Sequence, residues 1–460
     1  MAAGRPPIRW LERLIDLERT PGRAASLRVD LRPVRALLDR AGHPERDLRI
    51  LHVAGSKGKG SVALLAEAVL RAGGHRVGTF TSPHLERWTE RFRVDGTPVS
   101  EGELEGTLEV LRPAVEALRE DDRQPTPTWF DVTTTAAFLL FRGAGVDYAV
   151  IEVGLGGRLD STNAARARVA CITSIELEHT DRLGDTLAAI AREKAGILEA
   201  GRPVVVGALA AEALDVVEAR ARELGAPVVR FGRDLRVEPL PGPVHPCSAQ
   251  RFRIRDAGGA GAPGPLEVEA ELPVAGAHQT VNAALAVAAA RRLPGYADRL
   301  GTDGEALAHA RGLGRAVLPG RVEVVGRKPL RLVDSAHTPA SARALASVLE
   351  GLPRKDLRLV LSVSAGKQID ALLGLLVPGA TEVFTTRAEP LRSLPSGELA
   401  ARVRGRFAGV PVIAEDDPRR CLAAALGRSG PRDLLVAAGS VYLAGIARRV
   451  LRADAPAGRP

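Results

Sequence analysis

Seven consecutive residues combine glycine, lysine and serine in one short run, Gly55-Ser-Lys-Gly58-Lys59-Gly60-Ser61. An apolar stretch precedes this run, and apolar residues at helical spacing follow it, so we expect a turn between a strand and a helix. Glycines let backbone N–H groups approach an anion, a helix N-terminus favours negative charge, and lysine adds a mobile cation. The run is shorter than the G-x-x-x-x-G-K-[ST] pattern, and a glycine-rich turn without a ligand is the alternative. It predicts a phosphate-binding loop formed by Gly55, Gly58, Lys59, Gly60 and Ser61.

An acid that holds a metal beside such a loop usually ends a neighbouring buried strand. Glu152 closes the apolar run 147–152, and a second glycine-rich loop follows it directly. Carboxylate oxygen is a preferred ligand of Mg²⁺, so Glu152 is a predicted metal ligand. His179 lies just beyond the apolar run 169–175 and would reach the same edge if the strands are neighbours.

Lysine is scarce in this chain, and arginine carries nearly all the positive charge. Where arginine is the default cation, a retained lysine indicates a position that needs a compact or reactive amine. Lys59 lies in the predicted loop, and Lys194 follows His179 in a helical segment where arginine would serve as a surface charge. Lys194 is therefore a candidate for chemistry, with a solvated helix lysine as the alternative.

Short apolar runs alternate with amphipathic segments, which predicts an α/β fold with mostly parallel sheets covered by helices. The predicted strands are 48–53, 147–152, 169–175, 203–206, 330–334, 357–363, 381–386 and 433–437. A hairpin is predicted within 250–272, a helix over 278–293, and a linker over 294–304. The domain boundary is accordingly placed between 297 and 298, and residues 453–460 are expected to be a disordered tail.

Composition narrows the functional classes. The chain has a net charge of +9, 45% hydrophobic and 3% aromatic residues, and dispersed basic residues without a stacking pattern, so nucleic acid is not an expected partner. Three widely spaced cysteines exclude a disulfide framework and predict a reducing compartment. The apolar runs are too short to span a bilayer and the N-terminus lacks a signal-like apolar region, so a cytoplasmic protein without membrane contact is expected.

Further motifs follow one another along the chain in a recognisable order. The first motifs are His52-Val-Ala-Gly-Ser-Lys-Gly-Lys-Gly-Ser61, Thr81-Ser-Pro-His-Leu85, Glu152-Val-Gly-Leu-Gly-Gly-Arg-Leu-Asp160 with Thr162-Asn163, His179-Thr180 with Leu183-Gly-Asp-Thr186, and Glu193-Lys-Ala-Gly-Ile197. The later ones are His278-Gln-Thr-Val-Asn282, Pro319-Gly-Arg321, Asp334-Ser-Ala-His337 and Gly439-Ser440-Val-Tyr442. In this series the chain resembles folylpolyglutamate synthase and the bifunctional dihydrofolate synthase, of the Mur ligase superfamily, over essentially its full length.

The resemblance implies a P-loop ATPase-type domain with a mostly parallel sheet (1–297) and a smaller Rossmann-like α/β domain (298–460). ATP would contact Gly55, Gly58, Lys59, Gly60, Ser61, Asn282, Arg321 and Asp334. Two Mg²⁺ ions would be bound by Ser82, Glu152, His179 and Lys194, the last in carbamylated form, with a monovalent cation as a further cofactor to consider. A folate would contact Trp129, Phe130 and Arg158, and the loop after Thr81 would also border the pterin pocket. The incoming glutamate would contact His337 and Ser440, and Lys59, Lys194 and His337 would act in catalysis.

The implied reaction joins L-glutamate to a folate, to dihydropteroate or to both, through an acyl phosphate made with ATP, in a monomer whose domains close over the site. The chain departs from the family pattern at Ser56-Lys57, Glu178 and Thr338, which puts acceptor preference and glutamate handling in doubt. Two other readings stay open. They are a different Mur-type amino-acid ligase, acting on a cell-wall or storage-polymer precursor, and a nucleotide-binding protein without ligase activity.

Overall fold

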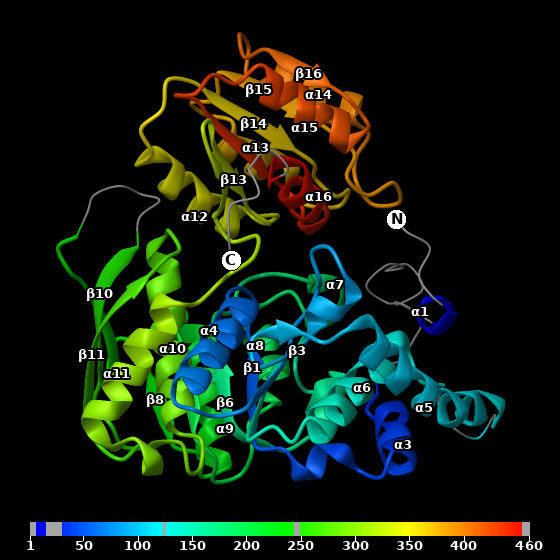
Figure 1. Cartoon of the computed structure of the whole chain (residues 1–460), viewed down its shortest axis with the longest axis vertical. Coiled ribbons are helices and arrows are strands. Elements are labelled where there is room, and N and C mark those ends of the chain that lie inside the picture. The colour runs from blue at the N-terminus through cyan, green and yellow to red at the C-terminus, as the bar shows by residue number, and fades with distance from the viewer. Residues whose placement is uncertain (1–5, 15–29, 122, 124–125, 243–248, 453–460) are drawn as a thin grey trace.

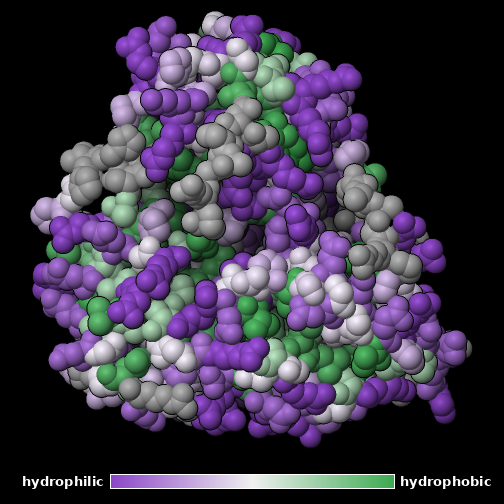
Figure 2. Space-filling view, viewed as in Figure 1, coloured by the Kyte–Doolittle hydropathy of each residue, from purple (hydrophilic) through white to green (hydrophobic). Residues whose placement is uncertain are grey.

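The computed structural model describes residues 6–14, 30–121, 123, 126–242 and 249–452, and these residues form two α/β units, one above the other in Figure 1. The tail predicted for 453–460 lies outside the described residues. Figure 2 shows hydrophilic side chains over most of one face, with a hollow where the two units meet. The α/β fold class with a mostly parallel first sheet, predicted from the alternating pattern, is confirmed.

The first unit is built on an eight-stranded sheet in the order β4-β3-β2-β5-β1-β6-β7-β8. Only the β2/β3 and β3/β4 pairs are antiparallel. β1 and β5 are buried along their whole length, as expected for strands covered on both faces. The strand bounds are β1 Ile50–Ala54, β2 Val77–Phe80, β3 Phe92–Val94, β4 Thr97–Pro98, β5 Tyr148–Glu152, β6 Ala167–Ile172, β7 Val204–Val206 and β8 Val228–Arg230.

Helices and a small sheet cover the two faces of this large sheet. On one face pack α4 (Lys59–Ala72), α10 (Ala277–Arg291) and α11 (Gly301–Gly314), together with an antiparallel sheet of β9 (Leu235–Pro239), β10 (Gln250–Asp256) and β11 (Leu266–Leu272). The other face is covered by α1 (Pro6–Leu11), α3 (Arg32–Arg40), α5 (Glu101–Glu120), α6 (Trp129–Gly143), α8 (Leu187–Ala195) and α9 (Ala211–Glu223). The carboxyl ends of the parallel strands are therefore left open to form a site.

The second unit has a six-stranded sheet in the order β12-β13-β17-β14-β15-β16, in which only the β12/β13 pair is antiparallel. Its strands are β12 Glu323–Arg327, β13 Leu330–Val333, β14 Leu357–Leu361, β15 Glu382–Thr385, β16 Val412–Ala414 and β17 Leu434–Ala438. The helices α12 (Pro339–Glu350), α13 (Ile369–Leu376) and α14 (Ser396–Arg406) cover one face, and α15 (Pro418–Gly427) and α16 (Val441–Arg452) cover the other.

The segment between the two sheets differs from the expected linker. Residues 301–314 form α11, and a Cβ placed on Gly312 would lie 2.7 Å from the carbonyl oxygen of Ala68 in α4, so the helix packs closely on the first unit. Leu313 and Leu318 also belong to the hydrophobic core of that unit. The boundary at 297/298 stays a prediction, and this packing favours a junction next to Pro319.

A buried histidine in α11 gives a test of how pH acts on the fold. His309 is fully buried, stacks on Tyr296 at 5.7 Å between ring centroids, and has no hydrogen-bond partner for either ring nitrogen among the described residues. Burial, with the charge of Arg291 next, lowers the pKa of His309 to about 3, so the folded state holds it neutral while the unfolded chain protonates near pH 6.5. Stability is therefore lost as the pH falls below about 6.5.

We expect His309→Leu to remove this loss of folding stability. For wild type at pH 5, the free energy of unfolding is lower by about 2 kcal/mol on account of His309. Urea unfolding of wild type and variant at pH 8 and at pH 5 measures it. The variant should gain stability relative to wild type on going from pH 8 to pH 5. An equal difference between the two proteins at both pH values would contradict the assignment.

None of the helices in the described part of the chain has the length and apolar character needed to cross a lipid bilayer.

Candidate active site

The glycine-rich run forms the turn between β1 and α4, as the sequence predicts. Gly58 is the N-cap of α4 with φ of 84°, a conformation that favours glycine, and no side chain caps this helix end. A Cβ on Gly55 would lie 1.9 Å from Oγ1 of Thr173, so the loop lies directly on the end of β6. Lys59 is the first residue of α4, and its Nζ donates to the carbonyl oxygen of Gly55 at 2.9 Å. The uncapped amides and this ammonium group suit an anionic ligand.

Glu152 lies beside this loop because β5 and β1 are parallel neighbours, with Glu152 level with Val53. A Cβ on Gly60 would lie 3.3 Å from Oε2 of Glu152, and the backbone N–H of Ser82 donates to the same oxygen at 2.9 Å. Burial raises the pKa of Glu152, and the positive charge of Lys59 is the largest opposing influence. The structure thus brings together the loop, the carboxylate and Ser82.

The donor set at this edge suits a hard divalent cation. Within the described ranges, no group of three or more histidine, cysteine, aspartate and glutamate side chains could hold a metal ion. Mg²⁺ does not need such a cage, because it is usually bound by one or two carboxylates, water and substrate phosphates. The buried carboxylate of Glu152, next to the N-terminus of α4 and to Ser82, fits that mode of binding.

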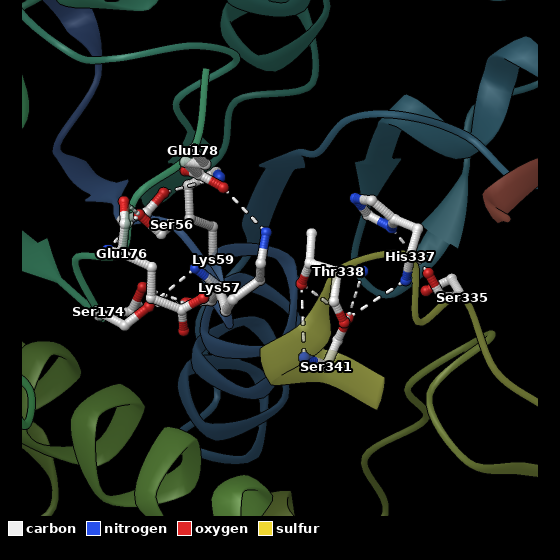
Figure 3. Close-up of polar contacts among 12 residues, drawn as sticks. Ser56, Lys57, Lys59, Ser174, Glu176, Glu178, Ser335, His337, Thr338 and Ser341 are labelled. Carbon is white, nitrogen blue, oxygen red and sulfur yellow. Dashed lines mark hydrogen bonds and ion pairs between the residues drawn. The ribbon is translucent and has the colours of Figure 1, made fainter. Parts of the chain in front are cut away.

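A second charged cluster is centred on Glu178, between β6 and α7 (Thr180–Leu183). Its Oε2 accepts from Nζ of Lys57 at 2.9 Å, and its Oε1 accepts from Nζ of Lys194 at 3.3 Å. Although burial opposes it, the charges of Lys59, Lys57 and Lys194 lower the pKa of Glu178 to about 2. This carboxylate is therefore a stable anion that holds lysine side chains at one place, as Figure 3 shows.

The two further predicted metal ligands lie on either side of Glu178. Lys194 of α8 is 1% exposed, and burial, followed by the charge of Lys59, lowers its pKa to about 8. His179 is the exposed N-cap of α7, with φ of 47°, and directly follows Glu178. The structure brings Lys194 into the charged cluster and places His179 at its rim.

Three further residues predicted to bind the nucleotide lie outside the glycine-rich loop, and they approach this loop from two directions. Asn282 of α10 packs on the loop, since a Cβ on Gly58 would lie 2.6 Å from its Oδ1. Asp334 follows β13, is buried, and accepts from the backbone N–H groups of Val322 and Ala336, each at 2.7 Å. Burial raises the pKa of Asp334, and the positive charge of Arg321, which hydrogen-bonds Ser335, is the largest opposing influence. The second unit therefore presents this pair at the junction.

His337 faces the charged cluster from the second unit. Its Nδ1 lies 2.8 Å from the carbonyl oxygen of Ser335, which can only accept, so Nδ1 carries the proton and Nε2 holds a lone pair. Burial, with the charge of Lys57 next, lowers the pKa of His337 to about 3. In Figure 3, His337 and Thr338 lie opposite Lys57 and Glu178 across the junction. Ser440, at the start of α16, is buried and its Oγ accepts from the backbone N–H of Tyr442 at 3.1 Å.

An aromatic cluster lies at the far end of the loop that joins β2 to β3. Trp129, at the start of α6, lies 5.0 Å from Trp88 and 6.1 Å from Phe130 between ring centroids. The guanidinium of Arg91 lies 4.6 Å from the centre of the Trp129 ring. Arg158, predicted to join this group, instead pairs with Glu193 of α8 at 2.7 Å. The structure thus unites Trp129 and Phe130 but directs Arg158 to another partner.

Sequence reasoning missed several members of these clusters. Glu178 and Lys57 were noted only as departures from a family pattern. They form an ion pair, although they are 121 residues apart in the sequence. Trp88 and Arg91 lie in the loop after Thr81, which the resemblance places at the pterin pocket, but neither residue was singled out. A tryptophan close to an arginine in that loop is the signal that could have marked them.

Comparison with protein families gives two matches. Residues 53–290 match the Mur ligase middle domain, and residues 320–441 match the Mur ligase, glutamate ligase domain.

Three curated relatives show how far the similarity extends. The folylpolyglutamate synthase of Lacticaseibacillus casei is 33% identical over 423 residues, which are 92% of this chain and 94% of the relative. The dihydrofolate synthase/folylpolyglutamate synthase of Mycobacterium tuberculosis is 33% identical over 93% of this chain and 91% of the relative. A probable bifunctional folylpolyglutamate synthase/dihydropteroate synthase of Haloferax volcanii is 35% identical over 90% of this chain, but the chain spans only 47% of that relative.

Solved structures share the fold over nearly the whole chain. The Mycobacterium tuberculosis folylpolyglutamate synthase, complexed with ADP and AMPPCP, has a TM-score of 0.82 at 32% identity and covers 95% of this chain and 98% of its own. An Escherichia coli protein, in complex with DHPP and ADP, has a TM-score of 0.81 at 29% identity and covers 98% of both chains.

Proposed function

This chain belongs to the Mur ligase superfamily, among the folylpolyglutamate and dihydrofolate synthases, and from that premise we propose that it joins L-glutamate to a folate with ATP. We also propose dihydropteroate as a second acceptor at the same site, which the bifunctional relative and the structure solved with DHPP support. The acceptors share a carboxylate that must be activated before an amine can form an amide with it.

One observation carries this proposal. Glu152 lies 3.3 Å from the Cβ position of Gly60, so a buried carboxylate faces the N-terminus of α4, at which Lys59 lies. A carboxylate beside an uncapped helix N-terminus and an ammonium group is the arrangement that binds a nucleoside triphosphate with its metal ion. The resemblance assigns ATP to these residues, together with Asn282, Arg321 and Asp334, and their positions around one junction support this.

The first step activates the acceptor. A carboxylate oxygen of the folate attacks the γ-phosphorus of ATP, the bond from that phosphorus to the bridging oxygen breaks, and ADP leaves with the electron pair. Lys59 neutralises charge that builds on the transferring phosphoryl group, because its ammonium lies at the helix N-terminus. Phe130 and Trp88 are partly exposed and offer the pterin ring an aromatic surface, and Trp129, only 1% exposed, packs behind them and holds them in place.

The second step forms the amide. The amine nitrogen of glutamate attacks the acyl carbon, the bond from that carbon to the phosphate oxygen breaks, and inorganic phosphate leaves. The nitrogen loses a proton to solvent. His337, whose pKa of about 3 makes it a weak base, is neutral, and the lone pair on its Nε2 can accept a hydrogen bond that orients the amine. Ser440 lies at the N-terminus of α16, where its Oγ accepts from the backbone N–H of Tyr442 and the helix dipole favours a carboxylate of the incoming glutamate.

A divalent metal at this edge would be held by Glu152 and Ser82, and a second by His179 and carbamylated Lys194. When bound, such metals supply positive charge that balances the phosphate oxygens. A monovalent cation stays a prediction, which the dependence of the rate on potassium concentration would test. A monomer also stays a prediction, which light scattering after gel filtration would test.

The carbamate on Lys194 is supported by its surroundings. The amine is buried among the charges of Lys59, Lys57 and Glu178, and its pKa near 8 leaves a usable neutral fraction for attack on carbon dioxide. We expect Lys194→Arg to lose at least about 10²-fold in ligation rate, because a guanidinium forms no carbamate and gives no oxygen ligand. Intact mass and steady-state rates, with and without added bicarbonate, measure this.

The exposed Lys355→Arg is the matched control and should keep wild-type activity. Lys194 that stays unmodified at saturating bicarbonate in active enzyme, or full activity of the Lys194→Arg variant, would refute the carbamate.

The whole proposal is tested with a panel of acceptors. Purified protein is incubated with ATP, Mg²⁺, L-glutamate and either dihydropteroate or reduced folates, and the products are weighed by mass spectrometry. A mass gain of one glutamyl residue, together with one phosphate released per amide, supports the proposal. Phosphate release with no acceptor dependence, or no product with any pterin, would remove it.

A further inference from the structure

The loop between β2 and β3, residues 82–91, contacts the second unit closely. A Cβ placed on Gly445 of α16 would lie 2.0 Å from the carbonyl oxygen of Leu85, so the loop backbone touches this helix where only glycine leaves room. The Leu85 side chain packs against the hydrophobic core that α15 and α16 share, and a Cβ on Gly320 would lie 3.1 Å from it. The 82–91 loop is thus seated in the second unit.

Ion pairs strengthen this contact. Nη1 of Arg448 in α16 donates to Oε1 of Glu86 at 2.6 Å, and its Nε donates to Oε2 of Glu323 at 2.8 Å. Arg449 lies 3.3 Å from the other carboxylate oxygen of Glu86. The side chains of Arg448 and Glu86 are only 11% and 16% exposed, so solvent screens this pair less than a surface pair. Arg448 therefore joins an acid of the 82–91 loop to an acid of β12.

The same loop forms part of the aromatic cluster. The Glu90 carboxylate accepts from the backbone N–H groups of Leu85, Glu86 and Arg87, which fixes the part that α16 contacts. The next residue, Arg91, is 2% exposed, donates to Nδ1 of His84 at 2.9 Å, and lies over Trp129. A continuous series of contacts therefore runs from α16 through Glu86 and Glu90 to the aromatic rings.

We propose that Gly445 and Arg448 are positioning residues for the folate: α16 holds the 82–91 loop, and the loop completes the aromatic cluster of the first unit. This rests on the proposed function, which assigns the pterin to that cluster. The pterin is then bound well only while the two units are docked, although no residue of α16 belongs to the aromatic cluster. Affinity for the acceptor depends on the second unit by this route, separately from the nucleotide residues Arg321 and Asp334.

Gly445→Ala tests the close contact, since the new methyl group must displace the loop from the helix. We expect the KM for folate to rise by about tenfold, while the KM for ATP changes less than about twofold. The matched control is Gly405→Ala, a helical glycine of α14 with nothing within 4 Å of its Cβ position, which should change neither constant. Equal increases of both KM values, or no increase for folate, would overturn the proposal.

A double-mutant cycle tests the ion pair independently and decides the matter if Gly445→Ala fails to fold. Glu86→Gln and Arg448→Gln should each raise the folate KM, the double variant should raise it less than the product of the two effects, and Arg448→Lys should restore part of the affinity. Strictly multiplicative effects would show that the two residues do not act together and would overturn the inference.

A measurement without catalysis separates this inference from the proposed function. Trp88 and Trp129 report on the pocket in a Trp10→Phe background, because the chain has three tryptophans. Acrylamide should quench their fluorescence more strongly in Gly445→Ala than in the Gly405→Ala control. If wild type ligates glutamate to no pterin, the proposed function fails, yet the quenching comparison still decides whether α16 holds the loop. Equal quenching in the two variants would overturn that role.

Discussion

Replacing Lys59 by alanine is expected to reduce ATP-dependent glutamate ligation by about 10²- to 10³-fold, the usual effect of losing one group that stabilises transition-state charge. The Nζ of Lys59 donates to the carbonyl oxygen of Gly55 at 2.9 Å and so lies inside the curve of the loop. Its ammonium is positioned to follow the phosphoryl group from ATP to the acceptor. Alanine keeps the helix start intact, because it is the strongest helix former.

Initial rates of amide formation with saturating ATP, folate and glutamate measure this prediction. Lys355→Ala is the control, because Lys355 is an exposed lysine outside the site. Circular dichroism should show the same helix content in all three proteins. A Lys59→Ala enzyme that ligates glutamate at more than about half of the wild-type rate would remove the role assigned to this amine.

Glu152→Gln is expected to have opposite effects on activity and on stability. Ligation should fall by about 10²- to 10³-fold, because a neutral amide is a poor ligand for Mg²⁺ and cannot balance its charge. Stability without ligand should rise. Burial raises the pKa of Glu152 above its ordinary value of 4.5, so the folded state binds this proton more tightly than the unfolded state does. The stability that this proton contributes is therefore lost as the pH rises past the ordinary value, and the neutral amide of glutamine avoids that loss.

Thermal unfolding of both proteins at pH 7, with and without Mg²⁺ and ADP, separates the two effects. Glu152→Gln should have the higher Tm alone and the smaller increase on adding the ligands. Glu101→Gln, at an exposed position in α5, should match wild type in every respect. A variant that unfolds earlier than wild type without ligand, and gains as much from Mg²⁺ and ADP, would contradict the placement of Glu152 at the metal.

The sequence predicted the phosphate side of the site well because it depends on local patterns. A glycine-rich turn before a helix, and an acid at the end of a buried strand, can each be recognised without knowing the fold. Once β1 and β5 are neighbours, Lys59 and Glu152 must meet at the same edge of the sheet. The order of the strands itself was not predictable from these runs.

The glycine content around the junction of the two units predicted a linker where the structure has a helix. The segment 294–304 was predicted to be a linker, yet α11 begins at Gly301 and packs on α4. Gly301 and Gly304, which suggested flexibility, lie in the first turn of α11, and it is Gly312 farther along the helix that serves close packing, since a side chain there would meet the backbone of Ala68. Tertiary contact decided the conformation where local propensity is weak.

Contacts between residues far apart in the sequence were the other feature that could not be predicted. Arg158 lies in a glycine-rich motif but pairs with Glu193, and nothing local to either residue indicates the partner. The strands β3, β4 and β16 are two or three residues long, too short for an alternating pattern to be counted.

The ion pair between Lys57 and Glu178 bears on how this enzyme could be engineered. Grafting the phosphate loop of another ligase onto this scaffold would replace Lys57 and leave the anion at 178 with one fewer counter-charge, next to a site that receives triphosphate. The two positions should therefore be exchanged as a unit. A chimera that changes only Lys57 would place an extra negative charge beside its nucleotide, whereas one that exchanges both positions would not.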